Sequence, residues 1–202
     1  GMSQMAGKLG QQIANPKVTA IDDGTIPNGW GSCNIDDEGM PMIKRTLIKD
    51  GILTSYMIDR LGSRRMNMPS TASGRRQDYS YEPTSRMTNT FFCPGKDKLE
   101  DMIASIKHGY MLFETNNGME DPKNWAIQCV AQYGIEIKDG KLTDNYVSPV
   151  VMSGYVPDLL KSISMISDDF VITGSGMCGK GYKEWVRVSD GGPALKVKVK
   201  LG

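Results

Sequence analysis

The clearest pattern along the chain is a pair of β-prone apolar runs, 42–49 and 52–58, that flank the dipeptide Asp50-Gly51. An Asp-Gly pair between two such runs is typical of a type I′ turn, because both central residues of that turn need a positive φ angle. The pattern therefore predicts a β-hairpin.

Apolar and polar residues also alternate over 125–137, which predicts a strand with one buried face. The turn signal Asp139-Gly140 leads this strand into 141–143 and indicates a second hairpin. Near the end of the chain, 195–201 alternates apolar residues with lysine. We expect a half-exposed strand there, whose lysines discourage pairing of its edge.

Two segments carry apolar residues at helical spacing. In 96–108 they form one face of a predicted helix, which Asp97 and Glu100 begin in the form of a capping box. His108 falls in the last turn of this helix, where it faces the negative end of the helix dipole rather than acting as a ligand. A shorter helix is expected over 157–163.

Many hairpins and two or so short helices predict an α+β fold, rich in antiparallel sheets and barrel-like in arrangement. The chain has 202 residues, of which 39% are hydrophobic, enough to bury the core of a single domain over 1–202. Gly1 before Met2 is interpreted as a cloning remnant. Residues 3–15 contain no start signal for an element, so we expect the chain to be a piece of a longer polypeptide.

Composition limits the classes of function. Lys and Arg number 24 against 23 Asp and Glu, a net charge of +1, so no global field steers the protein toward nucleic acid or an anionic membrane. No apolar stretch of about 18 residues and no signal peptide is present. Four scattered cysteines favour reduced thiols over a disulfide framework, which predicts a soluble, cytoplasmic protein. A zinc site of all four thiolates is possible, but their spacing does not support it.

The composition of the chain changes over 60–86, which is rich in arginine and in small polar residues. Its arginines stand among Ser, Thr, Gly, Pro and two tyrosines: Arg60, Arg64, Arg65, Arg75, Arg76 and Arg86. Three interpretations remain open: contact with single-stranded nucleic acid, contact with the carboxylates and carbonyls of a peptide, or a plain solvated loop. Just upstream, Asp36-Asp37-Glu38 is interpreted as a solvated acidic turn rather than a metal site, because hard-cation loops place ligands at alternate positions.

Cys178 lies in a glycine-rich segment, 174–181, directly after the apolar run 170–172. Glycines allow close approach of the backbone to another group, and the thiol is the one soft nucleophile or metal ligand within the segment. The alternative is a strand that ends in a glycine-rich turn, with Cys178 as a small buried apolar residue.

Several segments together resemble the C-terminal domain of the TldD/PmbA family, long labelled modulators of DNA gyrase and now associated with metalloproteases. The resemblance runs from about Ala6 to the C-terminus and is carried by the order and spacing of six segments: 18–25, 36–41, 47–53, 74–76, 86–90 and 176–180.

The family contains TldD-like zinc proteases, which have a His-Glu-x-x-x-His helix and a cysteine ligand in a Gly-x-Cys-Gly-Lys segment. PmbA-like (TldE-like) partners lack the metal ligands. Gly176-Met177-Cys178-Gly179-Lys180 resembles the TldD-like kind and implies that Cys178 is a zinc ligand. The histidine motif is absent here; in the family it lies just upstream of the segment that resembles 3–15.

The resemblance also implies what the whole protein binds. Peptide substrates enter extended, with Arg75 and Arg76 as contacts and Gly176 and Gly179 beside the cleft, and the protein pairs as a homodimer or with a PmbA/TldE-like subunit. The isolated chain is expected to be an inactive part of a zinc metallopeptidase. The alternative is a non-catalytic partner or scaffold domain that binds peptide or a sister subunit, while binding of nucleic acid or gyrase is disfavoured by the net charge.

Overall fold

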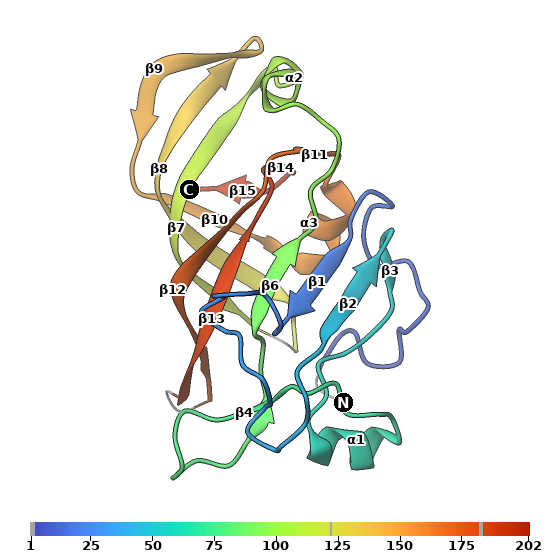
Figure 1. Cartoon of the computed structure of the whole chain (residues 1–202). Coiled ribbons are helices and arrows are strands. Elements are labelled where there is room, and N and C mark those ends of the chain that lie inside the picture. The colour runs from blue at the N-terminus through green and yellow to red at the C-terminus, as the bar shows by residue number, and fades with distance from the viewer. Residues whose placement is uncertain (1–2, 122, 182–183) are drawn as a thin grey trace.

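The computed structural model describes residues 3–121, 123–181 and 184–202 of the chain. In these ranges the chain folds into four sheets with three short helices beside them (Figure 1). The expected α+β, β-rich class is confirmed, although the described sheets stay open and none closes into a barrel. Gly1, interpreted as a cloning remnant, lies outside the described residues.

The largest sheet has six strands in the order β12-β13-β6-β1-β2-β3. Neighbouring strands run antiparallel, except that β13 and β6 are parallel. Their bounds are β1 (Ala20–Asp23), β2 (Lys44–Lys49), β3 (Ile52–Leu53), β6 (Asn89–Phe92), β12 (Val171–Lys180) and β13 (Glu184–Gly192). In the described part of the chain, no other strand pairs with β12, which is therefore one edge of the sheet.

A second sheet, of five strands, lies mostly in the half of the molecule away from the N-terminus (Figure 1). Its strands are β7 (His108–Glu120), β8 (Ala126–Lys138), β9 (Lys141–Val147), β10 (Val150–Tyr155) and β15 (Lys200–Leu201). Two small sheets pair β4 (Gly74–Arg75) with β5 (Thr84–Ser85), and β11 (Met165–Ile166) with β14 (Leu195–Lys196). The helices are α1 (Arg60–Met66), α2 (Leu99–Ala104) and α3 (Val156–Ser162), and none of these described helices has the length and hydropathy needed to cross a membrane.

The apolar core joins α3 to the six-stranded sheet. Its members come from the segment before β1, from β1 to β3, and from α3 and the residues after it. They are Ile13, Ala14, Val18, Ala20, Ile48, Leu53, Leu160, Ile163 and Ile166. Burial of such side chains contributes about 1.5–3 kcal/mol each, so this cluster holds the C-terminal third of the chain against its start.

Both predicted hairpins are confirmed. β2 and β3 pair across Asp50 and Gly51, which have φ angles of 51° and 79°, as a type I′ turn requires. β8 and β9 pair across Asp139 and Gly140, with φ angles of 48° and 77°. The helix expected over 157–163 is also present as α3.

The helix predicted over 96–108 was wrong in length. α2 ends at Ala104, and His108 begins β7 instead of closing a helix. The Asp97 carboxylate accepts a hydrogen bond from the Ile166 amide (2.8 Å) rather than capping α2. The reason is that the run 110–113 is β-prone, and long pairing of β7 with β8 overrides the short helical periodicity.

The single strand predicted over 195–201 was also wrong. Its first two residues form β14, which pairs with β11, while Lys200–Leu201 forms β15 against β10. The alternation is real, but the two halves of the segment pair with different sheets. An alternating pattern indicates extended backbone and does not name the partner strand.

A buried polar cluster surrounds the side chain of Asp22, a residue of β1. The Asp22 carboxylate, with no exposed surface, accepts hydrogen bonds from the Thr88 amide (2.6 Å), the Thr88 hydroxyl (2.7 Å) and the Thr90 hydroxyl (2.6 Å). Arg45, itself 5% exposed, lies 3.3 Å from the same carboxylate and also donates to the hydroxyl of Ser73. Burial lowers the pKa of Arg45, and the carboxylate of Asp22 opposes that shift.

Asp22→Ala is expected to lower the free energy of unfolding by about 3–5 kcal/mol, because it leaves the buried Arg45 guanidinium without its counter-charge. Urea unfolding followed by circular dichroism measures the loss. Thr90→Val, which removes one of the hydrogen bonds, is the milder variant and should cost about 1 kcal/mol.

The matched control is Asp168→Ala, which removes an exposed ion pair with Lys98 and should leave stability nearly unchanged. Equal losses for Asp22→Ala and Asp168→Ala would contradict a structural role of the buried pair.

Candidate functional site

The glycine-rich segment around Cys178 is a strand and not a turn. β12 continues through Cys178, which pairs opposite Val186 of β13, and ends at Lys180. The chain turns only at Gly181, where φ is 60°. The interpretation that placed a turn around Cys178 was therefore wrong, because the turn comes after the end of β12.

The glycines of β12 explain why the strand continues. A Cβ atom at Gly179 would lie 3.0 Å from the ring of Trp185, and one at Gly176 would lie 2.9 Å from the carboxylate of Asp190. Side chains of β13 thus fill the space above both glycines. The glycine pattern permits close packing within the hairpin rather than ending a strand.

Arg86 holds the hairpin near Cys178. Its guanidinium is only 2% exposed and donates from Nη2 to the carbonyl oxygens of Cys178 and of Glu184, the latter at 3.1 Å. Its Nε and Nη1 atoms have no hydrogen-bond partner among the described residues. The backbone that carries the thiol is therefore fixed by a buried cation.

Cys178 is the one predicted metal ligand. Its side chain is half-buried, and all four cysteines are free thiols in the described part of the chain. Within the same ranges, no three His, Cys, Asp or Glu side chains lie close enough together to hold a metal ion. His108 is in the second sheet, with Nε2 3.5 Å from a carboxylate oxygen of Glu136. Cys178 therefore has no second and third candidate ligand beside it among the described residues.

The arginine-rich segment is not a plain loop. It contains α1, β4 and β5, and Asp59 is the N-cap of α1, where its carboxylate accepts from the Gly62 amide at 2.5 Å. Arg75 donates from Nη1 to the carbonyl oxygens of Met87 and Arg187, both at 2.7 Å. The solvated-loop interpretation is wrong for this arginine, because its guanidinium binds the backbone of its own chain.

Two side chains from this segment take the place of a neighbouring strand along the outer part of β13. Arg75 binds the Arg187 carbonyl and Gln77 accepts from the Trp185 amide (2.9 Å), while Arg86 binds one carbonyl on each strand of the hairpin. Burial is the main cause that lowers the pKa of Arg75, and the nearby Arg86 cation acts in the same direction.

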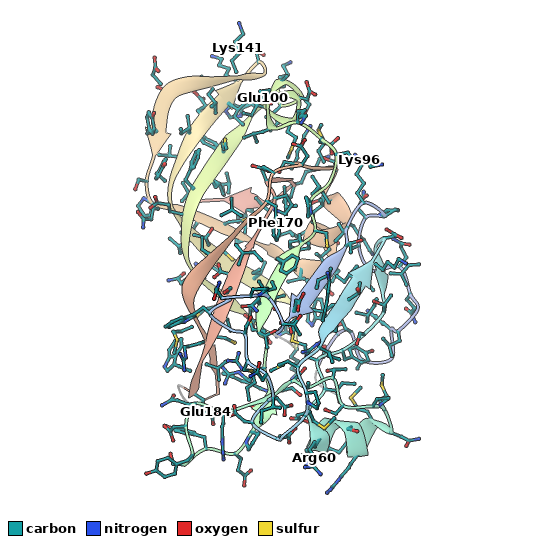
Figure 2. The ribbon with its side chains drawn as sticks, viewed as in Figure 1. Arg60, Lys96, Glu100, Lys141, Phe170 and Glu184 are labelled. Carbon is teal, nitrogen blue, oxygen red and sulfur yellow. The ribbon has the colours of Figure 1, made fainter. Side chains whose placement is uncertain are left out.

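A cavity of about 610 Å³ opens beside this hairpin. Three segments form its walls: the loop before β2, the region of β4, and the β12–β13 hairpin. Its lining includes Trp30, Asp37, Arg75, Arg76, Trp185 and Arg187. The hairpin runs toward the end of the molecule that carries α1 and β4 (Figure 1). Figure 2 shows Glu184 and Arg60 at this end, while Glu100 and Lys141 lie at the opposite end.

Buried hydrogen bonds fix the loop that carries Trp30. The Trp30 amide donates to the hydroxyl of Ser189 (3.0 Å), and the Gly31 amide donates to the side-chain oxygen of Asn89 (3.0 Å). Ser189 and Asn89 are 1% and 0% exposed. The Arg187 guanidinium then lies over the Trp30 ring, 5.1 Å from its centroid, in cation–π contact.

The acidic turn belongs to the loop before β2, and the prediction of a solvated turn is wrong for Asp36 but holds for the exposed Asp37. Asp36 is 4% exposed, and its carboxylate accepts from the amides of Glu38 (2.9 Å), Met40 (2.8 Å) and Gly74 (3.1 Å). Asp37 accepts from the Arg76 amide at 2.9 Å. The carboxylates satisfy backbone donors that would otherwise be unpaired.

The cavity and the thiol lie on opposite faces of the hairpin. Successive residues of a strand point to opposite sides, and directly paired residues share a side. Met177, Trp185 and Arg187 line the cavity, so alternation directs the Cys178 side chain to the other face, although its partner Val186, 3% exposed, also borders the cavity.

The predicted site residues thus separate into two groups. Arg75 and Arg76 line the cavity, and Cys178 lies on the other face of β12 between Gly176 and Gly179. Sequence reasoning missed the cavity residues of the Trp30 loop and of β13. Trp30 lies near Arg187 because its amide binds Ser189, which is 159 positions away in the chain. No local sequence pattern predicts a contact of that separation.

The family model that matches this chain is the PmbA/TldA metallopeptidase C-terminal domain, over residues 1–200. Among curated proteins, the metalloprotease TldD homolog of Haemophilus influenzae is 38% identical over 196 residues, which cover 96% of this chain and 40% of that protein. A metalloprotease of Methanothermobacter thermautotrophicus is 33% identical over 198 residues, 98% of this chain and 42% of that protein. The chain therefore spans about two fifths of these relatives.

Two solved structures share the fold. TldE from Thermococcus kodakarensis superposes with a TM-score of 0.78 at 24% identity, over 99% of this chain and 42% of that one. A Thermotoga maritima protein described as a modulator of a DNA gyrase has a TM-score of 0.74 at 23% identity, with the same coverage. With the match over residues 1–200, these comparisons confirm the resemblance to TldD and PmbA: the chain belongs to the PmbA/TldA metallopeptidase family.

Proposed function

We propose that the chain is the C-terminal domain of a cytoplasmic, TldD-like zinc-dependent metallopeptidase that hydrolyses peptides or unfolded polypeptides. The observation that carries the proposal is the place of Cys178. It lies in a Gly-x-Cys-Gly-Lys segment, on an edge strand, with a partly exposed side chain in a chain of this family. The curated relatives above are named metalloproteases.

The donor chemistry fits one ligand of a zinc site. Thiolate is a favoured zinc ligand, and a catalytic zinc takes three protein ligands with one position open to water. The described residues offer Cys178 without companions, so the other ligands would come from polypeptide outside this chain, and the chain by itself would be inactive. Zinc, when bound, would acidify a water and polarise the peptide carbonyl. Arg86 would keep the Cys178 backbone in place through its carbonyl.

The substrate would bind along the free edge of β12. An extended peptide can add a strand to an exposed sheet edge through main-chain hydrogen bonds. Gly176 and Gly179 let β13 pack tightly against β12, whose register with β13 is continuous from Gly176 to Lys180. Because strand side chains alternate, such a peptide would direct some side chains to the Cys178 face and the others to the cavity lined by Arg75 and Arg76.

The partner would be a second copy or a PmbA/TldE-like subunit. The fold is shared with TldE, so the architecture alone does not separate a catalytic domain from a non-catalytic partner or scaffold. Cys178 supports the catalytic kind, because the scaffold role needs no metal ligand at that position.

Cys178→Ser in the full-length protein is expected to reduce bound zinc from about one per chain to nearly none and to abolish peptide cleavage. Metal content is measured by plasma emission spectrometry and cleavage with a fluorogenic casein. Cys129→Ser is the matched control: that cysteine lies on β8, burial raises the pKa of its thiol, and zinc and cleavage should persist. Unchanged zinc in Cys178→Ser would favour the scaffold role.

Alanine substitutions of Arg75 and Arg76 are expected to affect different properties, stability for Arg75 and peptide binding for Arg76. Arg75→Ala should lower the free energy of unfolding by about 2–3 kcal/mol, because two backbone carbonyls lose a charged donor. Arg76→Ala should leave stability nearly unchanged but raise the KM for peptide in the full-length protein. Thermal unfolding and steady-state kinetics measure the two effects, and the same KM for Arg76→Ala and wild type would remove that arginine from the binding site.

A further inference from the structure

The cavity beside the hairpin has an excess of positive charge. Arg75, Arg76 and Arg187 line it against a single carboxylate, that of Asp37. In the described part of the chain none of these three guanidinium groups forms an ion pair, and Asp37 already accepts from the backbone amide of Arg76. The cavity therefore lacks counter-charge, although the whole chain carries only +1.

Four of the other lining residues are large, apolar and exposed. Trp30, Ile35, Met177 and Trp185 have exposed fractions of 44%, 58%, 49% and 45%, although each is large and hydrophobic. A group of exposed apolar side chains around a concave surface is typical of a binding site. Trp30 and Trp185 are rigid aromatic surfaces that lose little conformational entropy when a ligand packs on them.

The hydrogen-bond donors that the cavity can offer to a ligand are those of side chains. The amides of Gly74 and Arg76 already bind Asp36 and Asp37, so the wall near β4 offers no pair of free backbone amides of the kind that captures a C-terminal carboxylate. Guanidinium groups instead suit the planar carboxylate of an aspartate or glutamate side chain.

We propose that this cavity is a subsite for an acidic side chain of an extended peptide, with the apolar residues beside that side chain packed on Trp30 and Trp185. The proposal rests on the peptide-binding role given to the hairpin, but it needs neither zinc nor the Cys178 thiol, which lies on the opposite face. The cavity would then decide which peptides are held along β12.

The test is calorimetric titration of the 202-residue chain with capped peptides. Acetyl-Ala-Leu-Glu-Leu-Ala-amide is compared with the same peptide carrying Gln in place of Glu, and with the Gln peptide bearing a free C-terminal carboxylate. The Glu peptide is expected to bind at least about tenfold more tightly than either, because a carboxylate gains charge-assisted hydrogen bonds. Raising salt from about 0.05 M to about 0.5 M should weaken its binding, since the guanidinium groups are partly exposed.

Variants locate the subsite. Arg187→Gln and Arg76→Gln are each expected to weaken binding of the Glu peptide about tenfold and to leave the Gln peptide unaffected. The matched control is Arg64→Gln, which removes an exposed arginine in the last turn of α1 and should change nothing. Cys178→Ser should also bind the Glu peptide normally, so a failed zinc site and a failed subsite give different results. Thermal unfolding checks that each variant is folded.

Equal affinity for the Glu and Gln peptides, absence of binding, or a preference for the free C-terminal carboxylate would overturn the proposal. An equal effect of Arg64→Gln would do the same, because it would show only a general attraction of charge. Binding by this chain that disappears in the full-length protein would assign the cavity to an internal contact instead.

Discussion

The carboxylate of Asp22 lies fully buried where β1, β2 and the start of β6 meet, and it is satisfied by two threonines and Arg45. A buried charge is stable only when partners surround it, so these strands adopt the one register that brings the partners together. Arg45 also binds Ser73, just before β4. The position of Arg75, and with it one wall of the cavity, therefore follows from an ion pair elsewhere in the sheet.

The two edges of the β12–β13 hairpin differ in how their backbone groups are satisfied. Beyond β6, the outer part of β13 is held by the side chains of Arg75 and Gln77 in place of a strand. β12, on the other side, has no described strand neighbour. One edge is thus occupied by side chains of the same molecule, and the other presents its amides and carbonyls for pairing.

Local signals made part of this structure predictable. The turns at Asp50-Gly51 and Asp139-Gly140 were predictable because an Asp-Gly pair readily adopts the positive φ angles that such a turn needs. The role of Cys178 stays a prediction from its neighbours in the chain. The cavity was not predictable, because Trp30 meets β13 through contacts of very long sequence separation. The helix assigned over 96–108 failed for a related reason: pairing of β7 with β8 decided the backbone where the apolar spacing suited both forms.

The hydrogen bond from the Trp30 amide to Ser189 has a consequence for the order in which the molecule assembles, because it joins residues separated by 159 positions. Contacts of such separation form late, since a long loop must close before they can be made. During synthesis β1, β2 and β3 can pair while the Trp30 loop still lacks its partner. The walls of the cavity therefore meet only after the last strand of the large sheet has left the ribosome.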